Sequence, residues 1–140
     1  MPLLAIIALA TFAAVQAPAT KYDGTWIAQF EGVTWARLEL RTVNGAVTGG
    51  ISLGNIEMHK DGTLRHVEPA PKELSPIFDV RQKGDTLSFS RKDSNDADRF
   101  EVSSVGTDLQ LTFVFTEEDR REFAAEGLPL PKPVRLVKGK

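Results

Sequence analysis

The chain has 140 residues, contains no cysteine, and balances 17 basic against 19 acidic side chains for a formal net charge of −2. Without cysteine there is no disulfide, no thiolate metal ligand and no lipid attached through a thiol. No basic run is longer than Arg120-Arg121, so the positive face that nucleic acid binding requires is missing. A chain of this length can bury a real hydrophobic core without metal or disulfide.

Residues 1–19 carry no charged side chain and include an apolar run over 3–14. The small residues of Ala17-Pro18-Ala19 suit a signal-peptidase cut, so we predict that 1–19 is a secretory signal peptide. A retained membrane anchor is the alternative, but a span needs about 20 apolar residues and Gln16 ends the run too early. We therefore expect one domain over 20–140, periplasmic or secreted, with no membrane span.

The residues that follow alternate between apolar and polar, which is typical of half-buried β-strands. The pattern begins with Trp26, Ala28 and Phe30 on one face. Turn-forming pairs or triplets then divide the strands at Asn44-Gly45, Gly54-Asn55, Asp61-Gly62, Lys83-Gly84-Asp85 and Gly106-Thr107. The proline-rich stretch 68–76 predicts a loop instead of a strand.

The period changes only near the end of the chain. Thr116 is a suitable N-cap for a short helix over 117–126, and the three acidic residues after it favour a helix N-terminus. Gly127 can end this helix in a left-handed conformation. A last strand is expected at 134–137, after a run of prolines.

The sequence thus predicts an all-β fold with one short helix. Eight to ten short strands in sequential, antiparallel order most economically close into an up-and-down barrel. A flattened β-sandwich is the alternative.

The residues Asp23-Gly24-Thr25-Trp26, at the start of the first strand, resemble the Gly-x-Trp signature of the calycins. This group includes the lipocalins and the fatty-acid-binding proteins. The resemblance implies a barrel that holds an apolar ligand, with Trp26 closing its base against an arginine, either Arg120 or Arg135. The chain also resembles small exported bacterial domains that begin Gly-Thr-Trp and have no assigned function.

We expect a non-enzymatic barrel that binds a small apolar molecule and needs no cofactor. The sequence has no Gly-x-Ser-x-Gly, no His-Glu-x-x-His and no glycine-rich phosphate loop. Large residues of the predicted interior face would line the ligand cavity: Trp26, Phe30, Leu38, Phe89, Phe113 and Phe115. The alternative is a structural or protein-interaction module whose core is filled, because eight-stranded barrels occur in both forms.

Trp35 is a candidate contact for a protein partner. Strict alternation places it outside, on the face that carries Arg37, Glu39 and Arg41. Two alternatives remain open: Arg37 stacks on its ring, or the break at Gly32 lets the side chain turn into the core.

Glu57, His59 and His66 are weak candidates for a metal site. If Asp61-Gly62 is a two-residue hairpin loop, these three side chains share one face, and imidazole with carboxylate suits zinc. The same face is equally consistent with a solvated surface on which Glu and His form ordinary cross-strand pairs, so we expect no bound metal.

Overall fold

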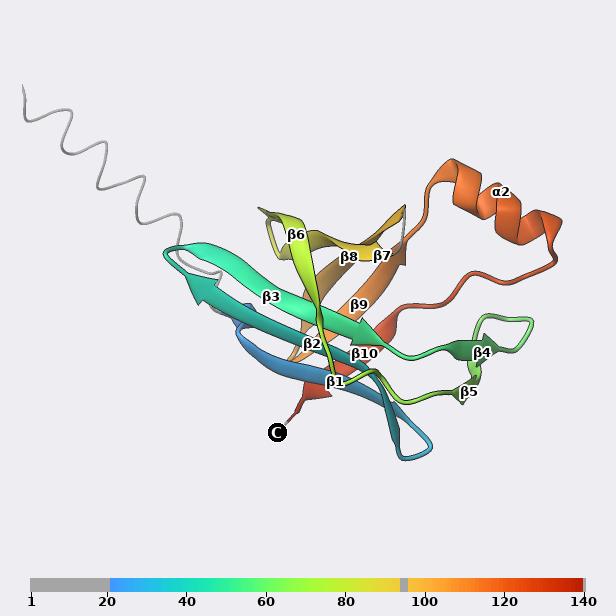
Figure 1. Cartoon of the computed structure of the whole chain (residues 1–140), viewed down its shortest axis with the longest axis horizontal. Helices are drawn as coiled ribbons and strands as arrows, with labels where there is room; N and C mark the ends of the chain where they lie inside the picture. Colours follow the sequence, from blue (N-terminus) through green and yellow to red (C-terminus); the bar gives the residue numbers. More distant parts are fainter. Residues whose placement is uncertain (1–20, 94–95, 140) are drawn as a thin grey trace, which may run out of the picture.

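The computed structural model describes residues 21–93 and 96–139, and the predicted signal peptide lies outside them. Eight antiparallel strands close into a barrel in the order β1-β10-β9-β8-β7-β6-β3-β2 (Figure 1). Their bounds are β1 Gly24–Phe30, β2 Val33–Val43, β3 Ala46–Leu53, β6 Ser75–Lys83, β7 Thr86–Asp93, β8 Asp96–Val105, β9 Asp108–Val114 and β10 Val134–Lys138. The predicted all-β barrel is confirmed, and the sandwich alternative is not formed.

Three further elements stand at one end of the barrel, which we call the mouth. Strands β4 (Ile56–Met58) and β5 (Leu64–Val67) form a separate hairpin, and helix α2 (Glu117–Ala125) follows β9 (Figure 1). Thr116 caps α2 in a reciprocal capping box with Asp119, as the sequence predicted for the N-cap. No helix in the described part of the chain is long and apolar enough to cross a membrane.

The alternation of inward and outward side chains explains how most of the barrel wall buries its apolar residues. Trp26, Leu38 and Ile51 are neighbours across β1, β2 and β3, and all three side chains point inward and are buried. Asn44 and Gly45 both have positive φ, 52° and 81°, as the hairpin turn predicted for this pair requires.

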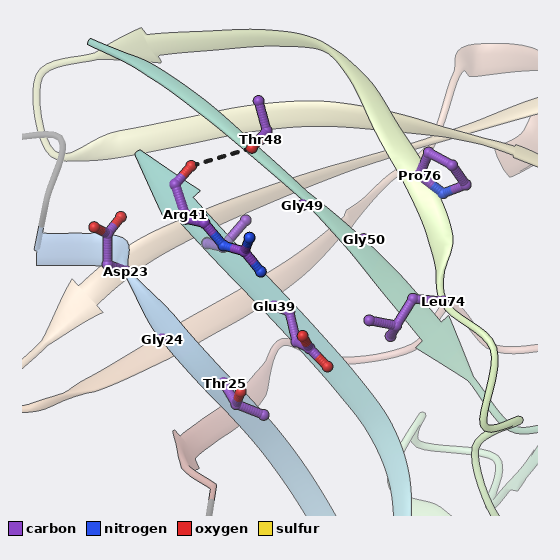
Figure 2. Close-up of a pocket in the computed structure, with 11 residues that line it drawn as sticks. Asp23, Gly24, Thr25, Glu39, Arg41, Thr48, Gly49, Gly50, Leu74 and Pro76 are labelled. Carbon is purple, nitrogen blue, oxygen red and sulfur yellow. Dashed lines mark hydrogen bonds between the residues drawn. The ribbon is translucent and has the colours of Figure 1, made fainter. Parts of the chain in front are cut away.

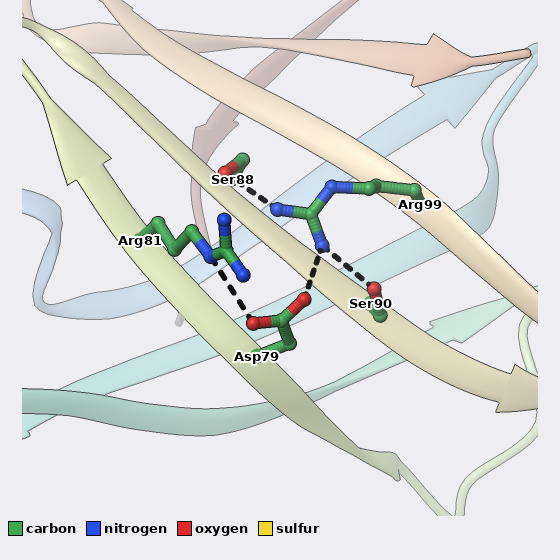
Figure 3. A network of polar contacts seen from close by, with 5 residues as sticks. All are labelled: Asp79, Arg81, Ser88, Ser90 and Arg99. Atoms are coloured by element: carbon green, nitrogen blue, oxygen red, sulfur yellow. Dashed lines mark hydrogen bonds and ion pairs between the residues drawn. The ribbon is translucent and has the colours of Figure 1, made fainter.

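The β6 strand is bent by a bulge. Its register against β7 shifts between Phe78 and Arg81, and Asp79 there adopts a positive φ of 53°. A bulge adds a residue to one strand and increases its bend and twist. On the outer face, the Asp79 carboxylate accepts from Arg81 and Arg99, each at 3.2 Å (Figure 3).

Arg99 also binds the two outward serines of β7. Its Nη1 donates to Ser90 Oγ at 2.8 Å and its Nη2 donates to Ser88 Oγ at 2.9 Å. This network joins the bulged part of β6 to β7 and β8 (Figure 3).

The end opposite the mouth, which we call the base, is closed by Tyr22 and Trp26. The Trp26 indole Nε1 donates to the Tyr22 carbonyl at 2.8 Å, and the Tyr22 hydroxyl donates to the Asp85 carbonyl at 2.7 Å. The Lys138 ammonium lies 4.6 Å from the centre of the Trp26 ring, because Lys138 is the direct cross-strand neighbour of Trp26. Cation–π contact of this kind holds a charge over an indole face.

The expectation that Arg120 or Arg135 would pack against Trp26 is therefore wrong. Arg120 is exposed on α2, and Arg135 forms an ion pair with Asp108 at 3.1 Å. Lys138 takes the position instead, because β10 pairs with β1 in a register that the sequence spacing does not reveal.

A surface ion pair at the base predicts a pH dependence. The Lys21 ammonium lies 2.8 Å from the Asp85 carboxylate, and this hydrogen bond lowers the pKa of Asp85 below its ordinary 3.8. The same bond raises the pKa of Lys21 above 10.5. The stabilisation by Asp85 is present above pH 3.8 and is lost as the pH falls through its lower folded value, whereas the contribution of Lys21 is lost only above 10.5.

We therefore expect Asp85→Asn to reduce the loss of stability on acidification. The measurement is urea unfolding, followed by tryptophan fluorescence, at several values between about pH 2 and pH 5. Lys21→Met should have the same effect, and an acid slope equal to that of the wild type in both variants would contradict the pair. Asp61 is a reference carboxyl for both variants, because its pKa is lowered by hydrogen bonds from Thr63 and does not depend on the Lys21–Asp85 pair.

Candidate functional site

Trp35 is buried, with 1% of its surface exposed, so its predicted role as an outward partner contact is wrong. Ala28 pairs with Ala36, but the next residue, Gln29, pairs with Thr34. Trp35 is therefore the extra residue of a β-bulge, and it faces inward together with Ala36. The alternative in which the side chain turns into the core is the one observed, although the bulge and not Gly32 is its cause.

Two neighbouring hollows at the mouth of the barrel have mainly apolar linings, and we call them together the mouth site. The first hollow has a volume of about 360 Å³ and lies between the end of the barrel, the β4–β5 hairpin and the prolines before β10. Its apolar walls include Phe30, Trp35, Ile56, Leu64 and Val134. The second has a volume of about 400 Å³, lies under α2, and is walled by Leu53, Phe100, Phe115 and Phe123. Both hollows are lined by Phe113 and Pro131.

The hairpin tip and the proline segment touch over the mouth. Gly62 is buried, and a methyl group at this position would lie 2.6 Å from the Leu130 carbonyl oxygen. This close approach keeps the tip of the β4–β5 hairpin beside Pro131 at the rim of the first hollow.

Five phenylalanine rings connect the core to the mouth. Phe89, Phe100 and Phe113 are cross-strand neighbours on β7, β8 and β9, with ring centres 5.7 Å apart in each pair. Phe115 follows at 6.5 Å from Phe113, and Phe123 of α2 lies 5.3 Å from Phe115. No residue of α2 is fully buried, and this last contact joins the helix to the aromatic row of the barrel.

A charged pair lies on the inner wall of the second hollow. Arg91 and Asp98 continue the inward-facing row beyond Phe89 and Phe100, and Arg91 Nη2 donates to Asp98 Oδ2 at 2.6 Å. The guanidinium also lies 5.7 Å from the centre of the Phe100 ring. The Asp98 side chain is 43% exposed, so its oxygens are accessible to a polar group in the hollow.

The predicted lining residues fall into two groups. Trp26, Leu38 and Phe89 are at most 2% exposed, lie in the packed core, and line neither hollow. Phe30, Phe113 and Phe115 lie at the mouth site. The structure also adds residues that the prediction missed, namely Phe123 on the helix and the Arg91–Asp98 pair.

Glu57, His59 and His66 do not come together as a metal site. Glu57 pairs with His66 as predicted, but the hairpin loop is one residue longer, since the His59 N–H donates to the Thr63 carbonyl. The Glu57 carboxylate instead accepts from Arg65 at 2.6 Å. Within residues 21–93 and 96–139, no group of three His, Cys, Asp or Glu side chains is placed to hold a metal.

No protein-family model matches the chain, and no significant match is found among curated proteins or solved structures. The closed antiparallel barrel with the short helix α2 is compatible with a calycin-like fold. Membership of that group stays a prediction from Gly24-Thr25-Trp26.

Proposed function

We propose that this protein is an exported, non-enzymatic barrel that binds one small apolar molecule at the mouth site. The observation that carries the proposal is the row of phenylalanine rings, which runs from the core to the open hollow under α2. Aromatic faces that remain accessible beside a hollow favour an apolar occupant.

The size and lining of the hollows support a small ligand. Small-molecule sites have volumes of about 300–1,000 Å³ and are mainly apolar with a few polar groups. Hollows of about 360 and 400 Å³ lie at the lower end of that range. The apolar part of the ligand would contact Phe113 and Phe115, and Asp98 would accept a hydrogen bond from a polar end.

Saturable binding of an uncharged fluorescent probe, N-phenyl-1-naphthylamine, tests the proposal. Phe123→Ala removes one wall of the second hollow and only one side chain from α2. We therefore expect it to weaken binding and raise the dissociation constant about threefold to tenfold. Phe78→Ala is the matched control, because Phe78 is 47% exposed on the outer wall and lines neither hollow.

Either of two results would contradict the proposal. One is equal binding by both variants, and the other is the absence of saturable binding to the wild type. Both would favour the alternative function, a structural or interaction module, which the filled core around Trp26, Leu38 and Phe89 would suit. Native mass spectrometry of the purified protein adds an independent check, since a bound ligand would appear as a stoichiometric adduct.

A further inference from the structure

The seam between β3 and β6 is short, with two residue pairs, as is the join between β1 and β10. The two strands share only the pairs Gly50↔Pro76 and Ile51↔Ser75, whereas β2 pairs with β3 from Ala46 to Leu53. Beyond Pro76, β6 pairs only with β7, and the bulge at Asp79 bends it away. The edge of β3 over 46–49 therefore faces β6 without strand pairing.

A groove of about 550 Å³ lies on the outer wall beside this edge (Figure 2). Gly49 and Gly50 form part of its floor: Gly50 is buried beneath the Leu74 side chain, whereas the backbone at Gly49 is open. Gly49 is exposed, and its φ of 152° marks a distorted strand. An unpaired strand edge with an accessible backbone is a template for another strand.

One bank of the groove carries an unpaired positive charge. Arg41 is exposed and reaches over the groove (Figure 2), and within the described residues it has no ion-pair partner. Its cross-strand neighbour is Thr48, whose hydroxyl donates to the Arg41 carbonyl at 3.4 Å. A strand added at the edge would lie two strand spacings from β2, about 9.6 Å, so Arg41 would meet an acidic side chain that extends back over the short Thr48.

The acidic residues of the groove are placed differently. Glu39 lies in the row of Gly50 and Pro76, where β6 already occupies the edge. The Asp23 carboxylate accepts a hydrogen bond from Thr42 at 2.7 Å. A side chain that enters opposite Thr48 therefore meets Arg41 first.

On the β6 side of the seam, Phe78 offers an apolar contact next to the groove, although it does not line it. If the register of Gly50↔Pro76 continued, Phe78 would pair with Thr48, but no such pair is formed. The Phe78 side chain is instead 47% exposed on the outer face of β6.

We propose that this edge is a docking site for an extended segment of a partner protein, which adds as a strand to Ala46–Gly49 and places an acidic side chain beside Arg41. Main-chain hydrogen bonds would supply much of the affinity in such a complex, and Arg41 with Phe78 would supply the selectivity. The site lies on the outer wall and is separate from the mouth site, so the two functions can be tested independently.

The test is a titration of the ¹⁵N-labelled full chain with a capped heptapeptide, Thr-Val-Thr-Asp-Thr-Val-Thr, up to about 1 mM. We expect amide shifts confined to 46–49 and 77–81. The same peptide N-methylated at alternate residues should not bind, because it cannot form the strand hydrogen bonds. A peptide with lysine in place of aspartate should bind about threefold to fivefold more weakly, the range that an exposed ion pair supports.

Arg41→Glu should reverse the preference between the aspartate and lysine peptides. Arg121→Glu, an equal charge change on the exposed surface of α2, should leave it unchanged. The proposal is overturned if no shifts occur, if they lie outside the seam, if the N-methylated peptide binds as well, or if Arg41→Glu leaves the preference unaltered.

Discussion

Trp35→Ala is expected to lower the free energy of unfolding by about 3–5 kcal/mol, the range for removal of a buried aromatic side chain. Among the described residues, Trp35 has the largest fully buried side chain. It packs from a bulge in the β1–β2 pair into the core near the mouth. Because small proteins are stable by only about 5–15 kcal/mol, this variant should be close to unfolding at room temperature. Urea unfolding followed by far-ultraviolet circular dichroism measures the loss.

Two variants give the comparison. Trp35→Phe keeps most of the buried ring and should lose less than Trp35→Ala, whereas Val43→Ala, at a residue that is 47% exposed, should change the stability by no more than about 0.5 kcal/mol. A loss below about 1 kcal/mol for Trp35→Ala would contradict the buried position. It would instead support the outward orientation that strict alternation predicts.

The elements of this fold were predictable because their signals are local. Period-two alternation marks the strands, Asn44-Gly45 marks a hairpin, and Thr116 with Gly127 marks the two ends of the helix. Each depends on residues close together in the chain. The closed barrel follows from sequential antiparallel pairing.

The errors arose where the register shifts. A change of register by one residue moves a side chain from one face of a strand to the other. Bulges at Trp35 and between Glu57 and Met58 do this, and so displaced the expected partner contact and the expected hairpin face. Their positions depend on which strands pair, and no local pattern specifies that.

The mouth site was predictable in part. Phe113 follows the interior alternation of β9 and packs against the core, and Phe115, one residue past the end of that strand, continues the pattern and lines the second hollow. Arg91 and Asp98 continue the inward alternation of β7 and β8, after Phe89 and before Phe100, but the sequence predicts a polar loop over 93–98 and charged side chains do not mark an interior position. Phe123 could not be placed, because its contact with Phe115 depends on how α2 turns back over the mouth.

Gly49→Ala is expected to cost about 2–4 kcal/mol of stability, because it combines two penalties. A methyl group at this position would collide with the carbonyl oxygen of Glu39, a backbone atom in the neighbouring strand. The φ of 152° is also one that residues other than glycine rarely adopt. The distortion lies directly beside Gly50↔Pro76, the pair at which strand pairing between β3 and β6 ends.

Gly106→Ala is a reference in which a positive φ occurs without a collision. Gly106 also has a positive φ, 63°, but a methyl group there would meet no atom within 4 Å. Its loss should therefore reflect the milder strain of the left-handed region alone, about 1 kcal/mol, and the additional loss in Gly49→Ala should report the collision with Glu39 together with the greater strain at φ 152°. If urea unfolding gives equal losses for the two variants, β2 and β3 are less closely packed at the seam than described. A larger loss for Gly49→Ala would instead indicate that a glycine is required at this position, since relief of the collision would have to separate β3 from β2, the strand with which it pairs here.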